Sequence, residues 1–360
     1  MMYKATIEET LLLRCLARLS PHADPVHRVT SLKKLAVGVA GRQTGVSKAL
    51  PGELVELLNG PLFCHTIHEI FHAFWPSSSF SVIGYAKMEA DIWSLATNAD
   101  GVLYAGSFRN LSIFQPPSFT GGFKQVSTTE ISQRPVTAIL PLEKSTIVGD
   151  EDGSLFRIAQ DGTISQGGRA SDWIHSIVST QHGLLVGTSR SLELFDPVSL
   201  TPKMKFDSIP EAYSLALLSE DIVAVGSDKK IYILNLKSGA ILAQFDADHC
   251  VYSIVCSESH IYALSFNGTL YVIDKSSVSL IQSNKILDGY CYSQSLALVP
   301  NAPFLIAKNH QKILILSLSK ESFLNTIHSF DFPSTHLTIS PDGTLFVSYD
   351  YDITAFRLSL

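Results

Sequence analysis

Charged residues and long apolar runs are both scarce in this chain. Charged side chains make up 17% of the 360 residues, whereas apolar residues make up 46%. No apolar run reaches the ~18–20 residues that a membrane-spanning helix needs, so we expect no membrane span. The balance is typical of a soluble protein whose strands are covered on both faces.

Cysteines are few and unpaired in sequence. They form no CxxC motif and none of the spacings of a zinc site, which argues against a zinc ribbon or a disulfide scaffold. We expect reduced thiols in a cytoplasmic or nuclear protein. The five are Cys15, Cys64, Cys250, Cys256 and Cys291.

Signs of catalysis are missing as well. No Ser–His–Asp order, paired-carboxylate motif or cofactor fingerprint recurs at matching positions. The glycine-rich stretch 36–45 lacks the Gly-Lys-Ser/Thr ending of a phosphate-binding loop. The sequence therefore favours a protein that is not an enzyme and holds no cofactor.

What the chain does contain is a repeat of ~40 residues, the period typical of propeller blades. A short apolar phrase opens each of seven units. It reads WSLA at 93–96, VTAI at 136–139, HSIV at 175–178, YSLA at 213–216, YSIV at 252–255, QSLA at 294–297 and LTIS at 337–340.

Two more apolar runs follow each phrase, separated by turns such as Asp152-Gly153 and Asn267-Gly268, which suit tight hairpins. The seventh unit lacks a fourth strand, and Ser79–Lys87 is a lone alternating strand that can supply it beside Ile353–Leu358. We predict an all-β, seven-bladed β-propeller over 79–360, closed by this N-terminal strand and preceded by a small α-helical region over 1–78.

From Ser79 to Leu360 the chain resembles a divergent WD-repeat protein, most clearly in KIYILNLKSGAILAQF at 230–245 and TLYVIDK at 269–275. Asp248 and His249 stand where the family often has Gly-His. The Trp-Asp pair is replaced by Phe195-Asp196, Leu234-Asn235 and Ile273-Asp274. The resemblance implies a scaffold or adaptor subunit of a multiprotein complex, which binds a protein or peptide on the upper face of the ring.

In WD-repeat rings the residue at the bulge that opens each first strand, and the residue two before it, face the mouth of the central channel. By resemblance these slots hold Trp93 with Asp91, Val136 with Arg134, His175 with Trp173, Tyr213 with Glu211, Tyr252 with Cys250, Gln294 with Tyr292, and Leu337 with Thr335. Exposed aromatic rings with a few charges are typical of binding hot spots, although such rings can also merely plug the channel. We predict a partner-binding patch of Asp91, Trp93, Arg134, Trp173, His175, Glu211, Tyr213, Tyr252 and Tyr292.

Charge divides unevenly along the chain. The first 50 residues are net basic, so the remainder is more acidic than the overall net charge of −6. An acidic ring is not expected to bind nucleic acid. The basic arm is interpreted as a solvated helix face, with a mitochondrial targeting segment or a contact to an anionic surface as alternatives.

Two motifs before the repeats offer other functions. HEIFH at His68–His72 matches the zincin pattern, in which His68 and His72 bind Zn²⁺ and Glu69 activates water; His65 lies one turn earlier. The alternative is a helix whose histidines are half-exposed surface residues or core residues and bind no metal. Leu50–Trp75 is similar to an F-box, which would make the protein a substrate receptor of a ubiquitin ligase. Packing of these helices on the propeller is the competing interpretation.

Overall fold

The computed structural model describes residues 80–116, 123–318 and 323–358, and every regular element in these ranges is a β-strand. The predicted helical region 1–78, the basic arm, the F-box-like segment and HEIFH lie outside the described residues. The chain divides into two compact units. The larger unit comprises residues 86–116 and 123–354, and the described part of the smaller unit comprises residues 80–85 and 355–358.

Strands that follow one another in sequence pair side by side and antiparallel, because short turns join them. The first sheet holds β2 (Ile92–Thr97), β3 (Leu103–Gln115), β4 (Lys124–Pro141), β5 (Ser145–Asp150), β6 (Ser154–Ala159) and β7 (Ile164–Arg169). The next sheet holds β8 (Ile174–Thr180), β9 (Gly183–Thr188), β10 (Leu192–Phe195) and β11 (Pro202–Lys205). A third holds β12 (Ser214–Leu217), β13 (Ile222–Ser227), β14 (Lys230–Asn235) and β15 (Ile241–Asp246).

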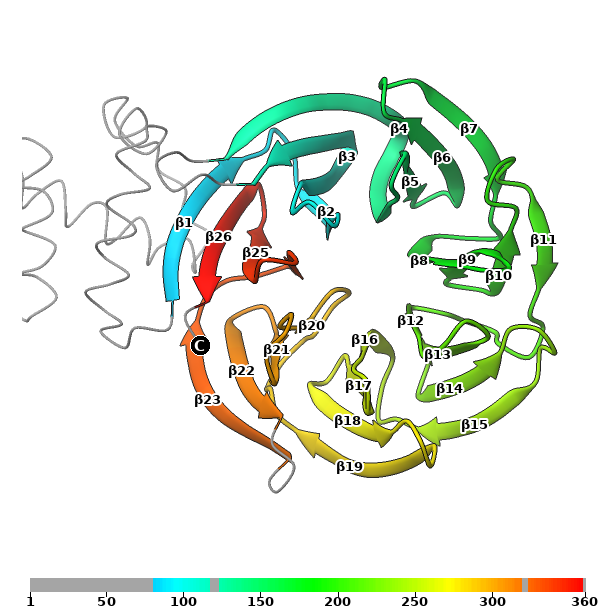
Figure 1. Cartoon of the computed structure of the whole chain (residues 1–360), viewed down its shortest axis with the longest axis vertical. Coiled ribbons are helices and arrows are strands. Elements are labelled where there is room, and N and C mark those ends of the chain that lie inside the picture. Colours follow the sequence, from blue (N-terminus) through cyan, green and yellow to red (C-terminus); the bar gives the residue numbers. More distant parts are fainter. Residues whose placement is uncertain (1–79, 117–122, 319–322, 359–360) are drawn as a thin grey trace, which may run out of the picture. The chain divides into compact units, whose positions relative to one another are not determined.

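The remaining strands form three more four-stranded sheets. One holds β16 (Val251–Cys256), β17 (His260–Ser265), β18 (Thr269–Asp274) and β19 (Ser279–Lys285). Another holds β20 (Leu296–Leu298), β21 (Phe304–Lys308), β22 (Lys312–Leu318) and β23 (Phe323–Asp331). The last joins β24 (His336–Ile339), β25 (Thr344–Tyr349) and β26 (Asp352–Leu358) to β1 (Phe80–Lys87). Within the larger unit the sheets are arranged around a common centre (Figure 1).

The prediction of seven blades is wrong: the described strands form six sheets, and therefore six blades. The cause is the length of β4, which has 18 residues. Its first half pairs with β3 as the outer strand of the first repeat, and its second half pairs with β5 as the inner strand of the second. One continuous strand thus merges two repeats into one six-stranded blade. The predicted helical N-terminal region gains no support, because the described part of the chain contains no helix.

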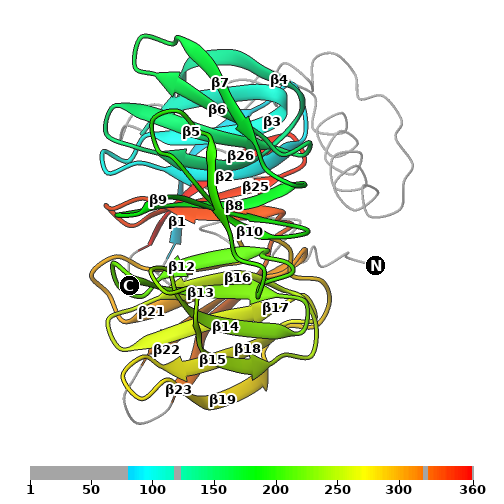
Figure 2. The ribbon, with the colours of Figure 1, turned by 90° about the vertical axis from the view of Figure 1, so that its right-hand side faces the viewer.

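The hydrophobic core lies between neighbouring sheets. One cluster joins Ala224 and Ile231 of the third sheet to Ile254, Ile261 and Ile273 of the fourth. Figure 2 shows these two sheets, β12–β15 and β16–β19, lying side by side. Each sheet therefore covers its neighbour, which explains the near-continuous apolar runs of the second and third strands.

The repeated phrase owes its hydroxyl residue to this packing. Ser94 Oγ donates to the carbonyl oxygen of Val136 in β4 at 2.8 Å, and Ser214 Oγ donates to that of Val251 in β16 at 2.9 Å. Ser253 Oγ accepts a hydrogen bond from the backbone N–H of Leu296 in the next sheet at 3.0 Å. The innermost strand of a sheet has one unpaired edge, so these hydroxyls supply partners for backbone groups that lack them.

A glycine at the end of the second strand allows two sheets to approach closely. A Cβ atom at Gly226 would lie 2.4 Å from the carbonyl oxygen of Val251 and 2.3 Å from Ser214 Oγ. Backbone atoms of a neighbouring strand cannot move aside without shifting the whole sheet. The position therefore requires glycine for reasons of space.

We expect Gly226→Ala to lower the free energy of unfolding by roughly 1–3 kcal/mol, the usual cost of overpacking a core. Chemical denaturation of the wild type and the variant measures this loss. An unchanged midpoint and slope would show that the sheets are not so closely packed in solution.

The predicted closing strand is confirmed in its pairing: β1 lies beside β26 in the sheet order β1-β26-β25-β24. Within the larger unit the first and last segments are also joined directly. The N–H of Met88 donates to the carbonyl oxygen of Tyr351 at 2.7 Å, and the N–H of Ile92 donates to that of Asp350 at 2.9 Å.

Candidate functional site

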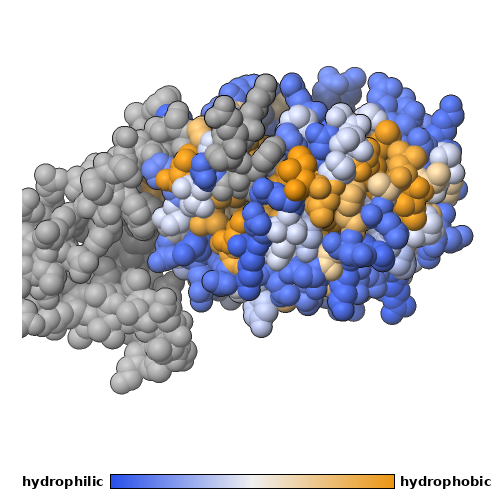
Figure 3. Space-filling model, turned by 90° about the horizontal axis from the view of Figure 1, so that it is seen from below, coloured by the Kyte–Doolittle hydropathy of each residue, from blue (hydrophilic) through white to orange (hydrophobic). Residues whose placement is uncertain are grey.

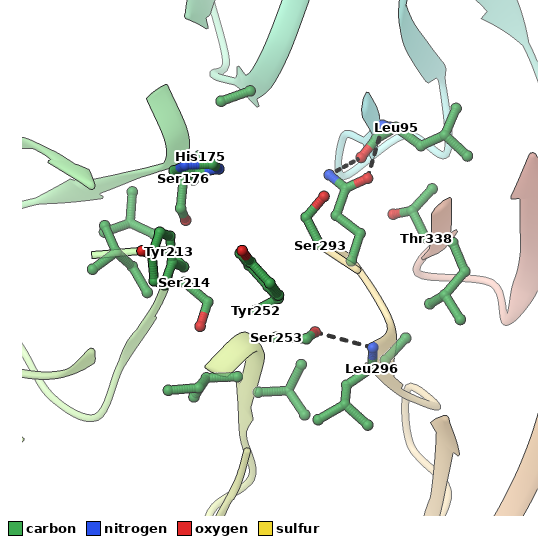
Figure 4. A pocket seen from close by; sticks show the side chains of 18 of the residues that line it. Leu95, His175, Ser176, Tyr213, Ser214, Tyr252, Ser253, Ser293, Leu296 and Thr338 are labelled. Carbon is green, nitrogen blue, oxygen red and sulfur yellow. Dashed lines mark hydrogen bonds between the residues drawn. The ribbon is translucent and has the colours of Figure 1, made fainter. Parts of the chain in front are cut away.

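A channel of about 390 Å³ lies between the inner strands of the larger unit. Its walls carry aliphatic side chains and several hydroxyls, among them Ser176, Ser214 and Ser253. Figure 4 shows His175, Tyr213 and Tyr252 on one side of this space. The channel is therefore open enough to admit a side chain, and aromatic rings border it.

Aromatic rings form a connected cluster at the channel mouth. The ring centroids of Trp93 and Trp173 are 6.5 Å apart, and Trp173 stacks on His175 at 4.9 Å. His175 contacts Tyr213 at 5.2 Å, and Tyr213 contacts Tyr252 at 4.9 Å. These are the five aromatic residues that the sequence placed at the centre of the patch, and they come from four repeats. That they bind a partner stays a prediction.

The cluster extends beyond the predicted residues through Phe266. Its ring contacts Tyr252 at 5.9 Å and Tyr292 at 5.5 Å. It also stacks on Tyr290 at 4.7 Å and contacts His249 at 4.8 Å. We call the whole set the aromatic cluster: Trp93, Trp173, His175, Tyr213, His249, Tyr252, Phe266, Tyr290, Tyr292 and His310, the last of which contacts Tyr292 at 4.8 Å.

Phe266, His249, Tyr290 and His310 were missed because the sequence analysis considered only the residues that open each first strand. The strand pattern of the sequence does contain a signal for Phe266. In an antiparallel pair the end of one strand lies opposite the start of the next, and Ser265 pairs with Val251. Residues directly after a second strand, such as Phe266, therefore lie at the same edge as residues directly before a first strand.

Four ladders carry a bulge at the start of the inner strand. It falls at Trp93, His175 and Tyr252, as predicted. In β4 it falls at Thr137, one residue later than predicted, so Val136 is fully buried in the core. Leu337 is likewise only 2% exposed. Val136 and Leu337 themselves therefore supply no surface for a partner.

The charged residues of the predicted patch differ in surroundings. Asp91 is exposed. Arg134 is exposed too, but its Nε lies 2.9 Å from Asp152 Oδ2 in an ion pair. Glu211 is half-buried and acts on Tyr213, whose pKa is raised by burial first and by the charge of Glu211 second. Of the three, Glu211 has the firmest link to the aromatic cluster.

Burial sets the protonation of the central rings. It lowers the pKa of His175 to about 4, although the charge of Asp172 opposes the shift. The imidazole is therefore neutral at pH 7, and its Nε2 lies 2.8 Å from Ser189 Oγ. Burial also raises the pKa of Tyr252 to about 12, so its phenol stays protonated. These rings offer neutral polar surfaces at neutral pH.

One hydrogen-bond donor of the aromatic cluster has no acceptor. The indole Nε1 of Trp173 is buried and has no hydrogen-bond partner in the structure. An unsatisfied buried donor costs about 1–3 kcal/mol, and such a group often marks a place where a ligand or water belongs.

Gln294 and Leu95 both line the channel, and Gln294 links their two repeats. Its Nε2 donates to the carbonyl oxygen of Leu95 at 2.8 Å, and its Oε1 accepts from the N–H of Leu95 at 3.0 Å (Figure 4). Its own carbonyl oxygen accepts the N–H of Leu337 at 3.1 Å. Gln294 thus connects three repeats, and its side-chain amide is engaged within the propeller instead of being free to contact a partner.

Asp248 is the centre of a small polar network beside the aromatic cluster. Asp248 Oδ2 accepts a hydrogen bond from Thr269 Oγ1 at 2.7 Å, and Asp248 Oδ1 accepts one from the hydroxyl of Tyr271 at 3.1 Å. The Tyr271 hydroxyl in turn accepts the N–H of Asp248 at 2.7 Å. The loop that carries His249 and Cys250 is held in place by these bonds.

Neither metal chemistry nor a membrane span is visible in the part of the chain that the structure covers. The residues described contain no group of three or more His, Cys, Asp or Glu side chains placed to hold a metal ion. The same residues include no helix with the length and apolar character to cross a bilayer. The zincin-like segment lies outside them.

The structure is similar to solved propellers. The crystal structure of the WD40 β-propeller domain of Doa1 matches with a TM-score of 0.65 and 11% identity, over 77% of this chain and 96% of that one. The fold is that of a WD40 β-propeller. A chain of the mitotic checkpoint complex matches with a TM-score of 0.67 and 14% identity, over 77% of this chain and 91% of that one. No family model and no curated sequence matches the chain.

Proposed function

We propose that this WD40 propeller is a non-catalytic scaffold that binds a protein or peptide at the channel mouth. The observation that carries this proposal is the aromatic cluster, whose rings from several repeats form one connected surface beside an open channel. Aromatic residues in such a setting are the usual anchors of binding hot spots. The two propellers that the structure resembles support the fold but not a particular partner.

Partial exposure of the rings supports the proposal further. Trp93, Trp173, Tyr213 and Tyr252 are neither buried nor fully exposed, and Tyr290 and Tyr292 are 56% and 39% exposed. Monomeric proteins rarely leave connected apolar surface open to water without a use for it. Because the rings already pack against one another, they would lose little side-chain freedom on binding.

Exposed apolar residues also occur on the outer strands, and they provide a comparison surface. Leu242 of β15 is 51% exposed and Leu280 of β19 is 41% exposed. Figure 3 shows apolar patches among polar ones on this side of the molecule. Neither residue belongs to the aromatic cluster, so they serve as a control.

We expect the double variant Trp173→Ala with Tyr213→Ala to lose at least about 2 kcal/mol of partner binding while it keeps its fold. Affinity purification of the full chain with quantitative mass spectrometry measures which partners are retained, and Leu242→Ala with Leu280→Ala is the matched control. A double variant that folds and keeps every partner of the wild type would remove the channel mouth as the binding site.

A further inference from the structure

Two tyrosines of the channel mouth lie next to two carboxylates. The rings of Tyr213 and Tyr252 are 4.9 Å apart. The charges of Glu211 and Asp228 both raise the pKa of each tyrosine, in addition to the larger effect of burial. Asp228 Oδ1 lies 3.2 Å from Sγ of Cys250, two residues before Tyr252, and Glu211 lies two residues before Tyr213, so the two carboxylates form an anionic edge on the aromatic cluster.

These two carboxylates lack a cationic partner. Neither Glu211 nor Asp228 forms an ion pair with any lysine, arginine or histidine among the residues that the structure describes. Asp228 Oδ1 accepts one hydrogen bond, from Cys250 Sγ at 3.2 Å. By contrast, other carboxylates of the same propeller are neutralised, since Asp152 pairs with Arg134 at 2.9 Å and Asp172 with Arg190 at 2.6 Å.

His175, whose ring contacts both tyrosines, does not supply a positive charge either. His175 is neutral at pH 7, because burial lowers its pKa. Its ring lies 5.2 Å from Tyr213 and 6.4 Å from Tyr252, so three non-parallel rings meet beside the channel. Both tyrosines and His175 line the channel, so a side chain entering it would pass along their surfaces.

Aromatic faces attract cations, and carboxylates at the edge of such rings add a direct charge attraction. An aliphatic stem with a charged end fits this arrangement, because the stem can lie in the apolar channel mouth while the charged end reaches the carboxylates. Acidic or neutral peptides would meet uncompensated negative charge here.

We propose that Tyr213 and Tyr252 bind the cationic side chain of a lysine or arginine presented by a partner peptide, with Glu211 and Asp228 as its counter-charges. The inference rests on the proposed function, since it names the chemical class of the partner that the channel mouth takes. Glu211 was expected at the rim of the patch, whereas Asp228 emerges only from the structure.

A randomised peptide library displayed on phage tests the inference without knowledge of the natural partner. It is panned on the purified full chain, and peptides are kept if they bind the wild type but not the Trp173→Ala, Tyr213→Ala variant. We expect the kept peptides to share one lysine or arginine. Substitution of that residue by norleucine should weaken binding at least about tenfold, and added salt should weaken binding as well.

Matched variants separate the roles of the carboxylates. Glu211→Gln with Asp228→Asn should weaken binding of the basic peptides at least about tenfold. The control Asp161→Asn with Glu220→Gln removes two exposed carboxylates from the turns that follow β6 and β12. It should leave binding of the basic peptides unchanged. Thermal melting verifies that both double variants fold.

The outcomes distinguish two failures. Kept peptides without a basic residue, or basic peptides that bind the Glu211→Gln, Asp228→Asn variant as tightly as the wild type, would overturn the inference and leave the proposed binding site standing. If no peptide prefers the wild type over the Trp173→Ala, Tyr213→Ala variant, the proposed binding site itself fails.

Discussion

Between pH 7 and pH 10 the free energy of unfolding of the wild type should rise by several kcal/mol more than that of Lys308→Met. Lys308 ends β21 and is 0% exposed. Its Nζ donates to the carbonyl oxygen of Thr335 at 2.5 Å, and Lys308 forms no ion pair with a carboxylate of the described residues. Burial lowers the pKa of this ammonium from 10.5 to about 7. A buried charge without a counter-charge is costly, and the fold avoids the cost by releasing the proton.

The direction of the pH effect follows from proton binding. Between about pH 7 and 10.5 the unfolded chain holds a proton on Lys308 that the folded chain lacks. The free energy of unfolding therefore increases with pH over this window, by roughly 3–5 kcal/mol at most. Below pH 7 both states hold the proton, so the full penalty remains and the curve is flat with respect to this group.

Neighbouring groups of the folded protein have pKa values outside this window, but the Cys291 thiol of the unfolded chain titrates near 9 in the wild type and in Lys308→Met alike. Burial raises the pKa of Cys291 to about 12 and lowers that of His336 to about 3. The pKa of His310 is lowered too, first by burial and then by the charge of Lys308. The difference in slope between the wild type and Lys308→Met therefore reports Lys308, because contributions of groups common to both proteins cancel.

Chemical denaturation of the wild type, Lys308→Met and the exposed-lysine control Lys312→Met across this pH range measures the effect. The lost hydrogen bond to Thr335 lowers the stability of Lys308→Met at every pH and cancels in the slope. Equal slopes for the wild type and Lys308→Met would contradict a neutral buried lysine.

Nothing in the sequence pattern identifies Lys308 as buried. The ladders place it opposite Ile313, at the register that Gly187 opposite Leu192 and Gly226 opposite Ile231 occupy in other repeats. Alternation and turn residues fix the strand, but they do not tell whether a terminal lysine points to water or between two sheets. That depends on how the next sheet packs.

The strands, the aromatic bulge positions and the closing strand were predictable, because each depends on local pattern: alternation, turn residues and the vacancy left after the seventh unit. The merging of the first two repeats had a weaker signal. Residues 131–135 between them contain no glycine, asparagine or aspartate to end a strand, and β4 runs through this stretch. The ring contacts between repeats and the anionic edge at Asp228 depend on tertiary packing, which a single sequence does not reveal.

Removal of residues 80–87 should prevent cooperative folding of the chain. β1 covers the outer edge of β26, and the two strands bury Val82, at 6% exposure, and Phe356, at 0%. Without β1 the N–H and C=O groups of this edge lose their partners, and apolar surface on β26 becomes exposed. The new chain end would then lie directly before Met88, and the hydrogen bonds of Met88 and Ile92 to residues 350–351 would break more easily.

Point variants of the same strand make the test sharper than the deletion alone. Val82→Asp places a carboxylate at a buried position and should cost several kcal/mol, whereas Lys87→Asp changes an exposed residue of the same strand and should cost little. A synthetic FSVIGYAK peptide added to the deleted chain should restore part of the melting temperature, because β1 contributes as an added strand rather than through its covalent connection. Thermal melting followed by circular dichroism measures all three. A deleted chain that melts as cooperatively and at the same temperature as the wild type would show that the pairing of β1 with β26 does not stabilise the fold.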